Sequence, residues 1–529
     1  MPLIRGGEAF ARCFFAGTAA AEPQEGGHMR TILFMMDSLN RRYLPAYGNP
    51  WVRTPNMDRL ARRSCVFDNH YVGSAPCMPA RHDLLTGRLD FLERNWSPVQ
   101  PFDCTLPYML GKHGVFSHMV TDHYHYFHLG GENYHAHFGS WDFIRGQEND
   151  VWVSDLGKLG QRPHYGQDKS QYRLNRQRFH SEADYPSPKT LRHAAQWLEE
   201  HHGDDDWFLL VDSFDPHEPF DFPEEDACEY PDEYQDALYY WPAYSTSDQA
   251  AREAIEHARR RYATLITMSD RWLGRALDVL DRYGMWEDTM VILTTDHGYM
   301  LGEHGFMAKN YMPAYNEVYQ IPLMVSLPGM RSPSRCAALT QNIDLFPTIL
   351  SFHGIDPEGC WHPLHGRSLL PLLRGEAPPW RDAVIYGMYG RQVNLFDGRY
   401  TYFCAPVRED NQPLNLYTAM PSTICHYWDR DHISDISKIE AGPFLSYTDY
   451  PVFKIPNTIT RLADDTHNFA RRYEVAGENL LFDLAADPGQ EHPLQDAALE
   501  RAMRKKLDAA MRLHDSPPEQ LQRLGLEAD

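Results

Sequence analysis

The chain has 529 residues, more than a single hydrophobic core usually supports, so we expect one large domain and a smaller one. Hydrophobic residues make up 43% and aromatic residues 13%, which excludes a disordered chain. The formal net charge of -23 excludes nucleic acid as a partner, because affinity for a duplex depends on lysine and arginine neutralising its phosphates.

The cysteine pattern and the N-terminal segment bear on the location of the protein. Nine scattered cysteines form neither a disulfide framework nor a zinc pattern, so we expect a reducing, cytoplasmic compartment. No apolar run approaches the ~20 residues that span a bilayer, so no membrane association is expected. Residues 1–28 make a poor signal peptide and are interpreted as a processed leader, an upstream start or a disordered tail. A leader would place the protein in the periplasm or outside the cell.

The first ordered segment is predicted to be a strand that ends at a carboxylate. Residues 31–36 form a short apolar run before Asp37, which is typical of a buried parallel strand. Because ligands bind beyond the carboxyl ends of strands in open α/β sheets, such an ending indicates a site. Two later segments repeat the design: 207–212 before Asp215 and His217, and 290–295 before Asp296 and His297.

A long helix is predicted between the second and third of these strands. Residues 255–280 carry apolar side chains at three- and four-residue steps, and Gly284 would end the helix. This order of elements indicates a βαβ crossover. A further helix is predicted from about residue 343, and the Pro- and Gly-rich residues 374–380 are interpreted as a boundary. We therefore expect a catalytic domain over residues 29–378.

The remaining residues, 379–529, are predicted to form a smaller α+β domain with an antiparallel sheet and a terminal helix. Its hairpin signal is the Asp397-Gly398 dipeptide, which suits a tight turn. Short strands are predicted at 383–388, 392–396 and 400–403. The expected fold class is α/β: a sandwich with a large, mixed but mostly parallel sheet flanked by helices, followed by this smaller domain.

Residues 74–88 carry the most informative pattern in the chain. Pro79 suits the first turn of a helix and Gly87 its end. Cys77 would then lie at the helix N-terminus, where free backbone N–H groups and the helix dipole favour an anion. Arg81 would follow one turn later over the same face. A lone cysteine at a helix start is more often a buried structural residue, so the assignment depends on the surrounding motifs.

The motif Cys77-x-Pro79-x-Arg81, followed by residues 84–88 (LLTGR), resembles the signature of the sulfatase family within the alkaline-phosphatase-like superfamily. Many ordered motifs together make the resemblance specific, and they span about residues 30–487. The further matches are 31–37 (TILFMMD), 54–61 (TPNMDRLA), 215–219 (DPHEP), 296–298 (DHG), 301–305 (LGEHG), Lys309, 479–484 (NLLFDL) and Asp487-Pro488.

The resemblance implies a sulfuric ester hydrolase whose nucleophile is made from Cys77. In this family a formylglycine-generating enzyme, a transient partner, oxidises the cysteine to formylglycine. One oxygen of the formylglycine hydrate attacks sulfur while the alcohol departs, and the other hydroxyl then expels sulfate and regenerates the aldehyde. This is two-step covalent catalysis assisted by a metal.

Asp37, Asp296 and His297 supply hard oxygen and imidazole donors, and modified Cys77 would add an oxygen, which together suit one divalent cation. The family often has a second acidic residue after the first, but Ser38 stands there in this chain. A calcium site is therefore less secure, and manganese becomes the alternative. Phosphonate monoester hydrolases of the same family also have a single aspartate at this point.

The resemblance also implies residues that contact the substrate. His217 and Lys309 correspond to the contacts with the substrate anion and the leaving group, and Arg81 to the residue that steadies the formylglycine. Asp122 stands where many relatives have a sulfate-binding lysine, so His123 or His125 is a candidate general acid. An ordinary surface role remains the alternative for both histidines. Asn95 is a further candidate for substrate contact.

Three functional hypotheses follow. The first is a sulfatase acting on a small-molecule or saccharide sulfate, because residues 124–152 and 230–244 are rich in aromatic side chains that suit sugar rings or aryl groups. Packed loop residues would explain the same composition. The second is a phosphonate monoester hydrolase or phosphodiesterase of the same fold, which Ser38 and Asp122 favour. The third is a binding protein without turnover, which the intact set of Cys77, Asp37 and Asp296 opposes.

Overall fold

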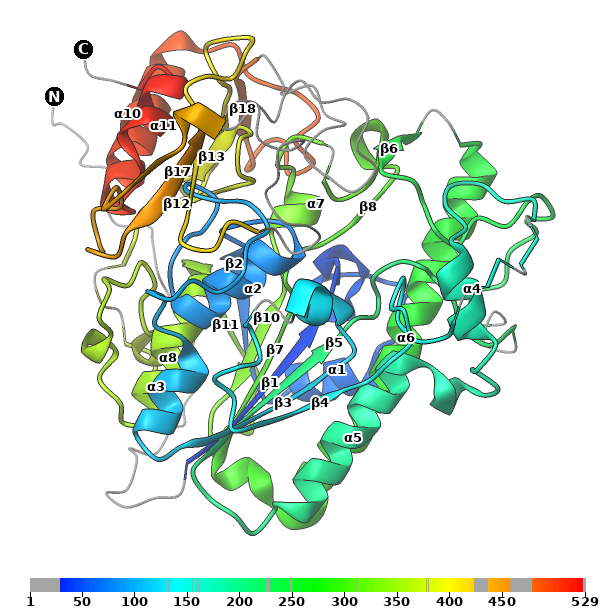
Figure 1. Cartoon of the computed structure of the whole chain (residues 1–529). Helices are drawn as coiled ribbons and strands as arrows, with labels where there is room; N and C mark the ends of the chain where they lie inside the picture. Colours follow the sequence, from blue (N-terminus) through cyan, green and yellow to red (C-terminus); the bar gives the residue numbers. More distant parts are fainter. Residues whose placement is uncertain are drawn as a thin grey trace, which may run out of the picture.

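An eight-stranded sheet forms the centre of the computed structural model (Figure 1). The structure describes residues 29–526 apart from 131–132, 155, 158, 161, 225–228, 248–249, 311, 377, 379, 423–435 and 457–477. The strand order is β11-β2-β10-β7-β1-β5-β3-β4, and β10 alone among these strands runs antiparallel to its neighbours. In chain order the strands are β1 (Arg30–Met36), β2 (Cys65–Tyr71), β3 (Phe116–Thr121), β4 (Ser140–Phe143), β5 (Trp207–Ser213), β7 (Thr289–Thr294), β10 (Leu323–Ser326) and β11 (Ser334–Gln341).

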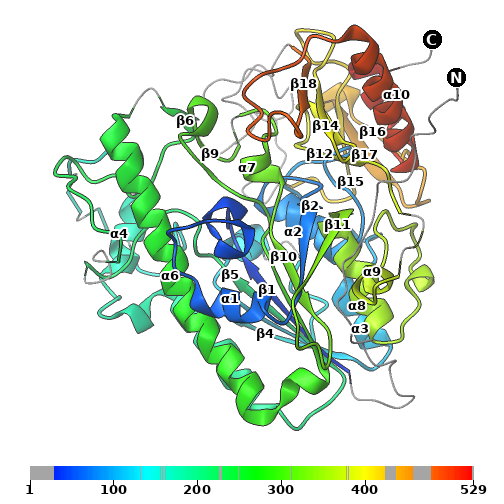
Figure 2. The same cartoon turned by 180° about the vertical axis from the view of Figure 1, so that it is seen from behind.

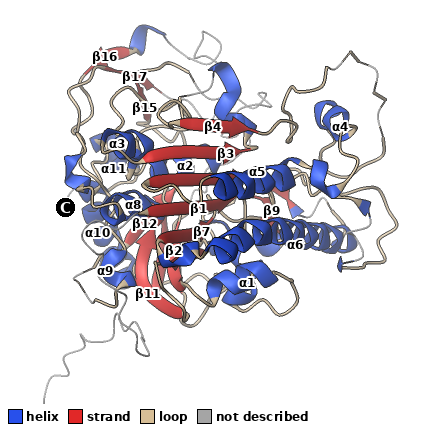
Figure 3. Ribbon diagram, turned by 90° about the horizontal axis from the view of Figure 1, so that it is seen from below, coloured by secondary structure: helices blue, strands red, loops and turns tan. Residues whose placement is uncertain are grey.

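Helices cover both faces of this sheet (Figure 3). One face carries α1 (Pro55–Ala61), α5 (Pro186–Glu200) and α6 (Arg252–Tyr283), and the other α2 (Cys77–Thr86), α3 (Leu106–Lys112) and α8 (Leu345–Phe352). Successive side chains of a strand point to opposite faces, so β1 contributes Ile32 and Phe34 to one core and Leu33 and Met35 to the other. This double burial explains the continuous apolar run at the start of the chain.

The long crossover helix α6 begins three residues before the periodic apolar pattern, at Arg252, and ends where that pattern predicted. Gly284 follows it in the left-handed conformation, with φ 67°, which a glycine adopts without a Cβ penalty. The helix packs against α5 and α1, and Leu265, Leu273 and Leu280 lie fully buried in the shared core. The predicted crossover is therefore confirmed.

The C-terminal region contains the predicted small antiparallel sheet (Figure 2). Helix α10 (Ala497–Leu513) packs against it through Met503, Leu507 and Met511. The sheet has the order β12-β13-β14-β18 and consists of β12 (Val384–Gly387), β13 (Val393–Phe396), β14 (Tyr400–Cys404) and β18 (Leu480–Asp483). The remaining elements are α4 (Ser170–Arg176), α7 (Asn316–Tyr319), α9 (Leu370–Leu373), α11 (Pro518–Arg523), β6 (Ser245–Thr246), β8 (Met300–Leu301), β9 (Phe306–Ala308), β15 (Asn415–Thr418), β16 (Glu440–Gly442) and β17 (Val452–Pro456).

The predicted fold class is confirmed by this mixed, mostly parallel sheet and by the smaller antiparallel sheets in the C-terminal region. The domain limits at residues 29–378 and 379–529 stay a prediction, as does the cytoplasmic location. The interpretation of residues 1–28 lies outside the described residues. Among the described helices, none is both long and apolar enough to cross a bilayer.

A buried ion pair fixes helix α2, which carries Cys77 and Arg81, to the loop before α3. His82 Nε2 lies 2.7 Å from Asp103 Oδ2, and both side chains are buried. Burial alone would lower the pKa of His82, but Asp90 and Asp103 outweigh it and raise the pKa to about 9. The histidine is therefore charged in the folded protein at neutral pH.

We expect this pair to make stability depend on alkaline pH. The pKa of His82 is about 9 in the folded state against 6.5 unfolded, so its contribution is complete below pH 6.5 and is lost as the pH rises through 9. The contribution should be on the order of 3 kcal/mol. Urea unfolding of the parent and of His82→Gln should show a stability difference that shrinks between pH 6.5 and pH 10. A difference that stays constant over this range would contradict the assignment.

Candidate active site

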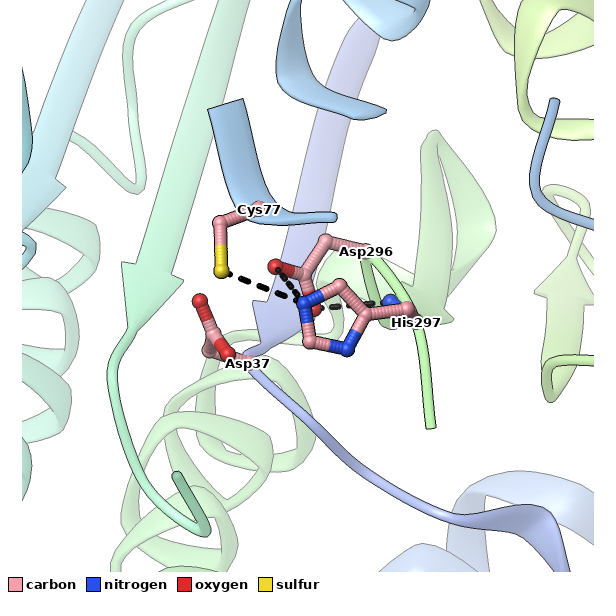
Figure 4. A group of neighbouring side chains, drawn as sticks. All are labelled: Asp37, Cys77, Asp296 and His297. Carbon is pink, nitrogen blue, oxygen red and sulfur yellow. Dashed lines mark hydrogen bonds and ion pairs between the residues drawn. The ribbon is translucent and has the colours of Figure 1, made fainter. Parts of the chain in front are cut away.

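Four side chains that could hold a metal converge beyond the carboxyl ends of the central strands (Figure 4). Asp37 follows β1, Asp296 and His297 follow β7, and Cys77 is the first residue of α2. One ligand atom from each lies within 4.8 Å of all the others, and all four residues are buried. The structure thus brings together the whole set that the sequence predicted as metal ligands.

Local backbone geometry explains two of these positions. Gly298 follows His297, and a Cβ there would lie 2.0 Å from the Glu317 carbonyl oxygen, so only glycine fits this close approach. At the other side of the site, Ser74 N and Oγ both donate to Asp83 inside α2, each at 2.7 Å. These two hydrogen bonds hold the loop before Cys77 against the helix and fix where the helix begins.

The Cys77 thiol contacts the ligand cluster directly. Its Sγ lies 3.2 Å from His297 Nε2, while His297 Nδ1 contacts the Gly298 carbonyl oxygen at 2.8 Å. Burial raises the pKa of Cys77 well above its usual range, and Asp37 and Asp296 add to the effect against the opposing charge of Lys309. The unmodified side chain is therefore a neutral thiol in these surroundings.

Arg81 lies at the centre of a fully buried charge network. Its guanidinium donates to both oxygens of Asp212, at 2.8 and 2.9 Å, and to Asp296 Oδ2 at 2.6 Å. A third carboxylate, Asp37 Oδ2, lies 3.0 Å from Nη2. Tyr126 donates a further hydrogen bond to Asp212 at 2.7 Å. Arg81 thus links the ends of three strands, which leaves its guanidinium almost no freedom.

Asp212 is the residue of this network that sequence reasoning missed. It lies within β5, next to the central strand, and its side chain is fully buried. The available signal was the one that identified Asp37, because both carboxylates come at the end of an apolar strand run. Asp212 differs in that it lies outside the ligand cluster, and its carboxylate accepts hydrogen bonds from Arg81 and Tyr126.

Lys309 and Ser38 form the opposite wall of the site. Lys309 Nζ donates to Ser38 Oγ at 2.9 Å and lies 3.6 Å from Asp37 Oδ1. Ser38 in turn donates to Asp37 Oδ1 at 2.7 Å, and its backbone N–H to Asp296 Oδ1 at 3.0 Å. Burial would raise the pKa of Asp37, but Lys309, His217 and Arg81 hold it well below its usual range. The carboxylate is therefore ionised.

Three predicted histidines lie around this centre. His123 Nε2 is 3.5 Å from Asp37 Oδ2, and the His125 ring lies edge-on at 4.9 Å from the His123 ring. His217 Nδ1 contacts the Glu218 carbonyl oxygen at 2.5 Å, which leaves Nε2 for a substrate. Burial lowers the pKa of all three, with Arg81 adding to the effect on His123 and Lys309 on His217. All three are neutral in this environment.

Two other predicted positions lie at the margin. Asp122 accepts hydrogen bonds from the Phe214 backbone N–H and from Ser187 Oγ, each at 2.8 Å, so its carboxyl supports the loop before His217. Asn95 is half-buried and, among the described residues, makes no hydrogen bond with the site. It adjoins Trp96, whose ring lies 5.3 Å from that of His125. The role of Asn95 as a substrate contact stays a prediction.

The donor set fits a divalent cation. Asp37 Oδ2 is fully buried and accepts no hydrogen bond in the described structure, so a carboxylate oxygen remains for a ligand bond. Two carboxylates and an imidazole suit a transition metal such as manganese or zinc, whereas calcium usually takes oxygen ligands alone. The group also includes Cys77, whose Sγ is the fourth potential ligand atom.

The fold and this site together define a hydrolase of the alkaline-phosphatase-like superfamily. A family model described as Sulfatase matches residues 30–355, more than half of the chain. The chain belongs to the sulfatase family, and it is a sulfuric ester hydrolase. The resemblance found in the motifs of the sequence is therefore confirmed.

Two characterised relatives illustrate the range of the family. The chain is 26% identical over 421 residues to a choline-sulfatase of Rhizobium meliloti, covering 72% of this chain and 79% of that protein. It is 25% identical over 436 residues to an N-acetylglucosamine-6-O-sulfatase of Bacteroides thetaiotaomicron, covering 70% and 76%. Choline and N-acetylglucosamine, the alcohols that these two names give, are chemically very different.

A solved structure supports the fold. The phosphonate monoester hydrolase of Agrobacterium radiobacter superposes with a TM-score of 0.64 over 92% of this chain and 96% of that chain, at 19% identity. At this identity the likeness concerns the arrangement of elements. It shows that the same architecture carries hydrolases of esters other than sulfates.

Proposed function

We propose that this protein hydrolyses a sulfate monoester, with Cys77 converted to formylglycine and one divalent metal held by Asp37, Asp296, His297 and the modified side chain. The observation that carries the proposal is the convergence of these four residues, with one ligand atom from each within 4.8 Å, at the N-terminus of α2. Calcium and manganese are the candidate ions. When bound, the metal would lower the pKa of the nucleophile and offset negative charge on the ester.

The residues of the chain have separate tasks in this proposal. Burial would lower the pKa of Lys309, but the nearby carboxylates of Glu218 and Asp37 raise it, so Lys309 stays charged and attracts the ester anion. Arg81, held by Asp212, steadies the hydrate on residue 77. His217 offers Nε2 as a hydrogen-bond partner on the leaving-group side. His123 and His125 are neutral in the free protein, and the negative charge of a bound ester would raise the pKa of either one, so they stay the candidate general acids for the departing alcohol.

The covalent cycle has two chemical stages and a rehydration. One hydroxyl oxygen of the hydrate forms a bond to sulfur, its proton leaves to a base, and the S–O bond to the alcohol breaks as the alcohol takes up a proton. The second hydroxyl then loses its proton, the C–O bond to sulfate breaks, and the aldehyde returns. Water adds to the aldehyde and restores the hydrate, so the net reaction consumes one water.

For the substrate we propose a saccharide sulfate, with aryl sulfates as model substrates. The named activity of one relative concerns a sugar sulfate, and aromatic side chains of Trp96, Tyr124 and Phe214 surround His125. The second candidate function is phosphonate monoester or phosphodiester hydrolysis. It is favoured by Ser38 in place of a second acidic residue and by the likeness to a phosphonate monoester hydrolase.

Parallel assays separate the two candidates. On enzyme produced with a formylglycine-generating enzyme, we expect kcat/KM for an aryl sulfate to exceed that for an aryl phosphonate monoester by at least tenfold, or about 1.4 kcal/mol of transition-state stabilisation. Both assays should use the same aryl leaving group, so that the two substrates differ only in the group that is attacked, a sulfate in one and a phosphonate in the other. A phosphonate preference of the same size would replace the sulfatase assignment with the second function.

A further inference from the structure

A cavity is lined by residues of α4, the helix labelled in Figure 1, and by none of the residues of the ligand cluster. This cavity, here called the arginine pocket, has a volume of about 370 Å³, within the range of small-ligand sites. Four guanidinium groups line it in a chain whose net charge is -23. Its charged and aromatic lining residues are Arg162, Arg173, Arg176, Arg261, Asp221, Glu224, Tyr172, Tyr240 and Phe222.

Two carboxylates in or beside the arginine pocket, Asp221 in its lining and Asp168 next to it, already accept hydrogen bonds. Asp168 accepts from Arg162 at 2.7 Å, from Tyr240 at 3.0 Å and from Arg173 at 3.2 Å. Asp221 Oδ2 accepts from Arg176 at 2.7 Å and from Tyr172 at 3.0 Å. Two carboxylates thus serve four guanidinium groups, and Glu224 at the lining adds only one more negative charge. Counted over the described residues, four guanidinium groups thus outnumber three carboxylates.

The guanidinium groups of the arginine pocket have more N–H donors than the described acceptors use. Arg261 donates only through Nε, to the Phe220 carbonyl oxygen at 2.9 Å, and its Nη2 lies 3.9 Å from Asp221. Arg176 uses Nε and Nη1, while Arg162 uses Nε and Nη2. Each guanidinium carries five N–H groups, so several of them have no acceptor among the described residues. Such a lining suits a ligand with several anionic oxygens.

Three aromatic side chains complete the lining. Tyr172 and Tyr240 lie with ring centroids 6.4 Å apart, and Phe222 is covered by the Arg261 guanidinium at 4.4 Å. Aromatic rings suit the apolar faces of sugars. Phe222 and Asp221 come directly after the His217 loop, so the arginine pocket and the candidate active site share one segment of chain.

We propose that the arginine pocket binds the sulfo group of a sulfated sugar at a site separate from the catalytic centre. The choice of ligand rests on the proposed function, since a sulfatase acting on saccharides meets substrates with more than one sulfo group. A second anion site would retain such a molecule while the catalytic centre hydrolyses another ester. Binding here needs neither the metal nor the formylglycine.

Calorimetry on the full-length Cys77→Ala variant, which cannot turn over substrate, tests this at low ionic strength. The probes are a monosulfated monosaccharide, the same sugar without sulfate, and inorganic sulfate. We expect two binding events per chain for the sulfated sugar, and loss or at least tenfold weakening of one event after Arg162→Gln and Arg176→Gln. Arg331→Gln, at a 74% exposed surface arginine paired with Glu287, is the matched control and should retain both events.

A turnover assay distinguishes failure of this inference from failure of the proposed function. The Arg162→Gln and Arg176→Gln variant with intact Cys77 should hydrolyse an aryl sulfate within about twofold of the parent, because neither arginine contacts the catalytic set. If hydrolysis is absent but the arginine-dependent binding event persists, the proposed function is wrong and the proposed binding site is supported. Should the double variant not fold, the single Arg162→Gln change, at a 40% exposed side chain, gives the same test. Unchanged binding in these variants, or equal binding of inorganic sulfate, would overturn the proposal.

Discussion

Replacement of Cys77 by alanine is expected to lower kcat for an aryl sulfate by about 10³-fold or more, because it removes the only atom from which the nucleophile can be made. The effect on the free energy of unfolding should be small, since Cys77 is the first residue of α2 and its side chain contributes only one sulfur atom to the core. Initial rates should be measured on protein produced together with a formylglycine-generating enzyme. Peptide mass spectrometry across residue 77 should find formylglycine in the parent and alanine in the variant.

The matched control for this experiment is Cys360→Ala, which removes a half-exposed thiol outside the ligand cluster and should leave activity within about twofold. Finding only an unmodified thiol in fully active parent enzyme would refute the role given to Cys77. The buried, neutral thiol described above would then need a different activation to act as a nucleophile.

Substitution of Asp37 by asparagine is expected to abolish stable metal binding and to lower kcat/KM by about 10²- to 10³-fold. The change is nearly isosteric, but it replaces an ionised carboxylate, one oxygen of which is buried without a hydrogen bond, by a neutral amide. Lys309 and Arg81 would then face less negative charge, which further weakens affinity for a cation.

Metal content after dialysis, measured by elemental analysis, provides the direct readout. We expect about one divalent ion per chain in the parent and none in Asp37→Asn, and restoration of chelator-treated parent by calcium or by manganese identifies the ion. Asp410→Asn, at a 34% exposed residue paired with Arg408, should retain the metal and the activity. A full complement of metal in Asp37→Asn would show that the ion binds elsewhere.

Most of the fold could be predicted from local patterns. The apolar runs of β1, β5 and β7 identified strands because strands buried on both faces carry continuous apolar residues. The α6 pattern identified a helix because its apolar side chains recur with the helical period. Boundaries shifted by a few residues, since the end of an element depends on its caps and its neighbours: the helix predicted from residue 343 begins as α8 at Leu345, after a 3₁₀ turn.

The amino-acid sequence was enough to predict the sulfatase family, the strand-end carboxylates Asp37 and Asp296, and Cys77 at a helix start. Motifs and strand ends are local features, and parallel strands end at one edge of the sheet. The contacts of Asp212 with Arg81 and of Asp122 with the loop before His217 could be found only in the folded chain. The arginine pocket likewise became visible only in the structure. Such pairings join residues far apart in the chain, and side-chain packing, rather than any sequence period, selects them.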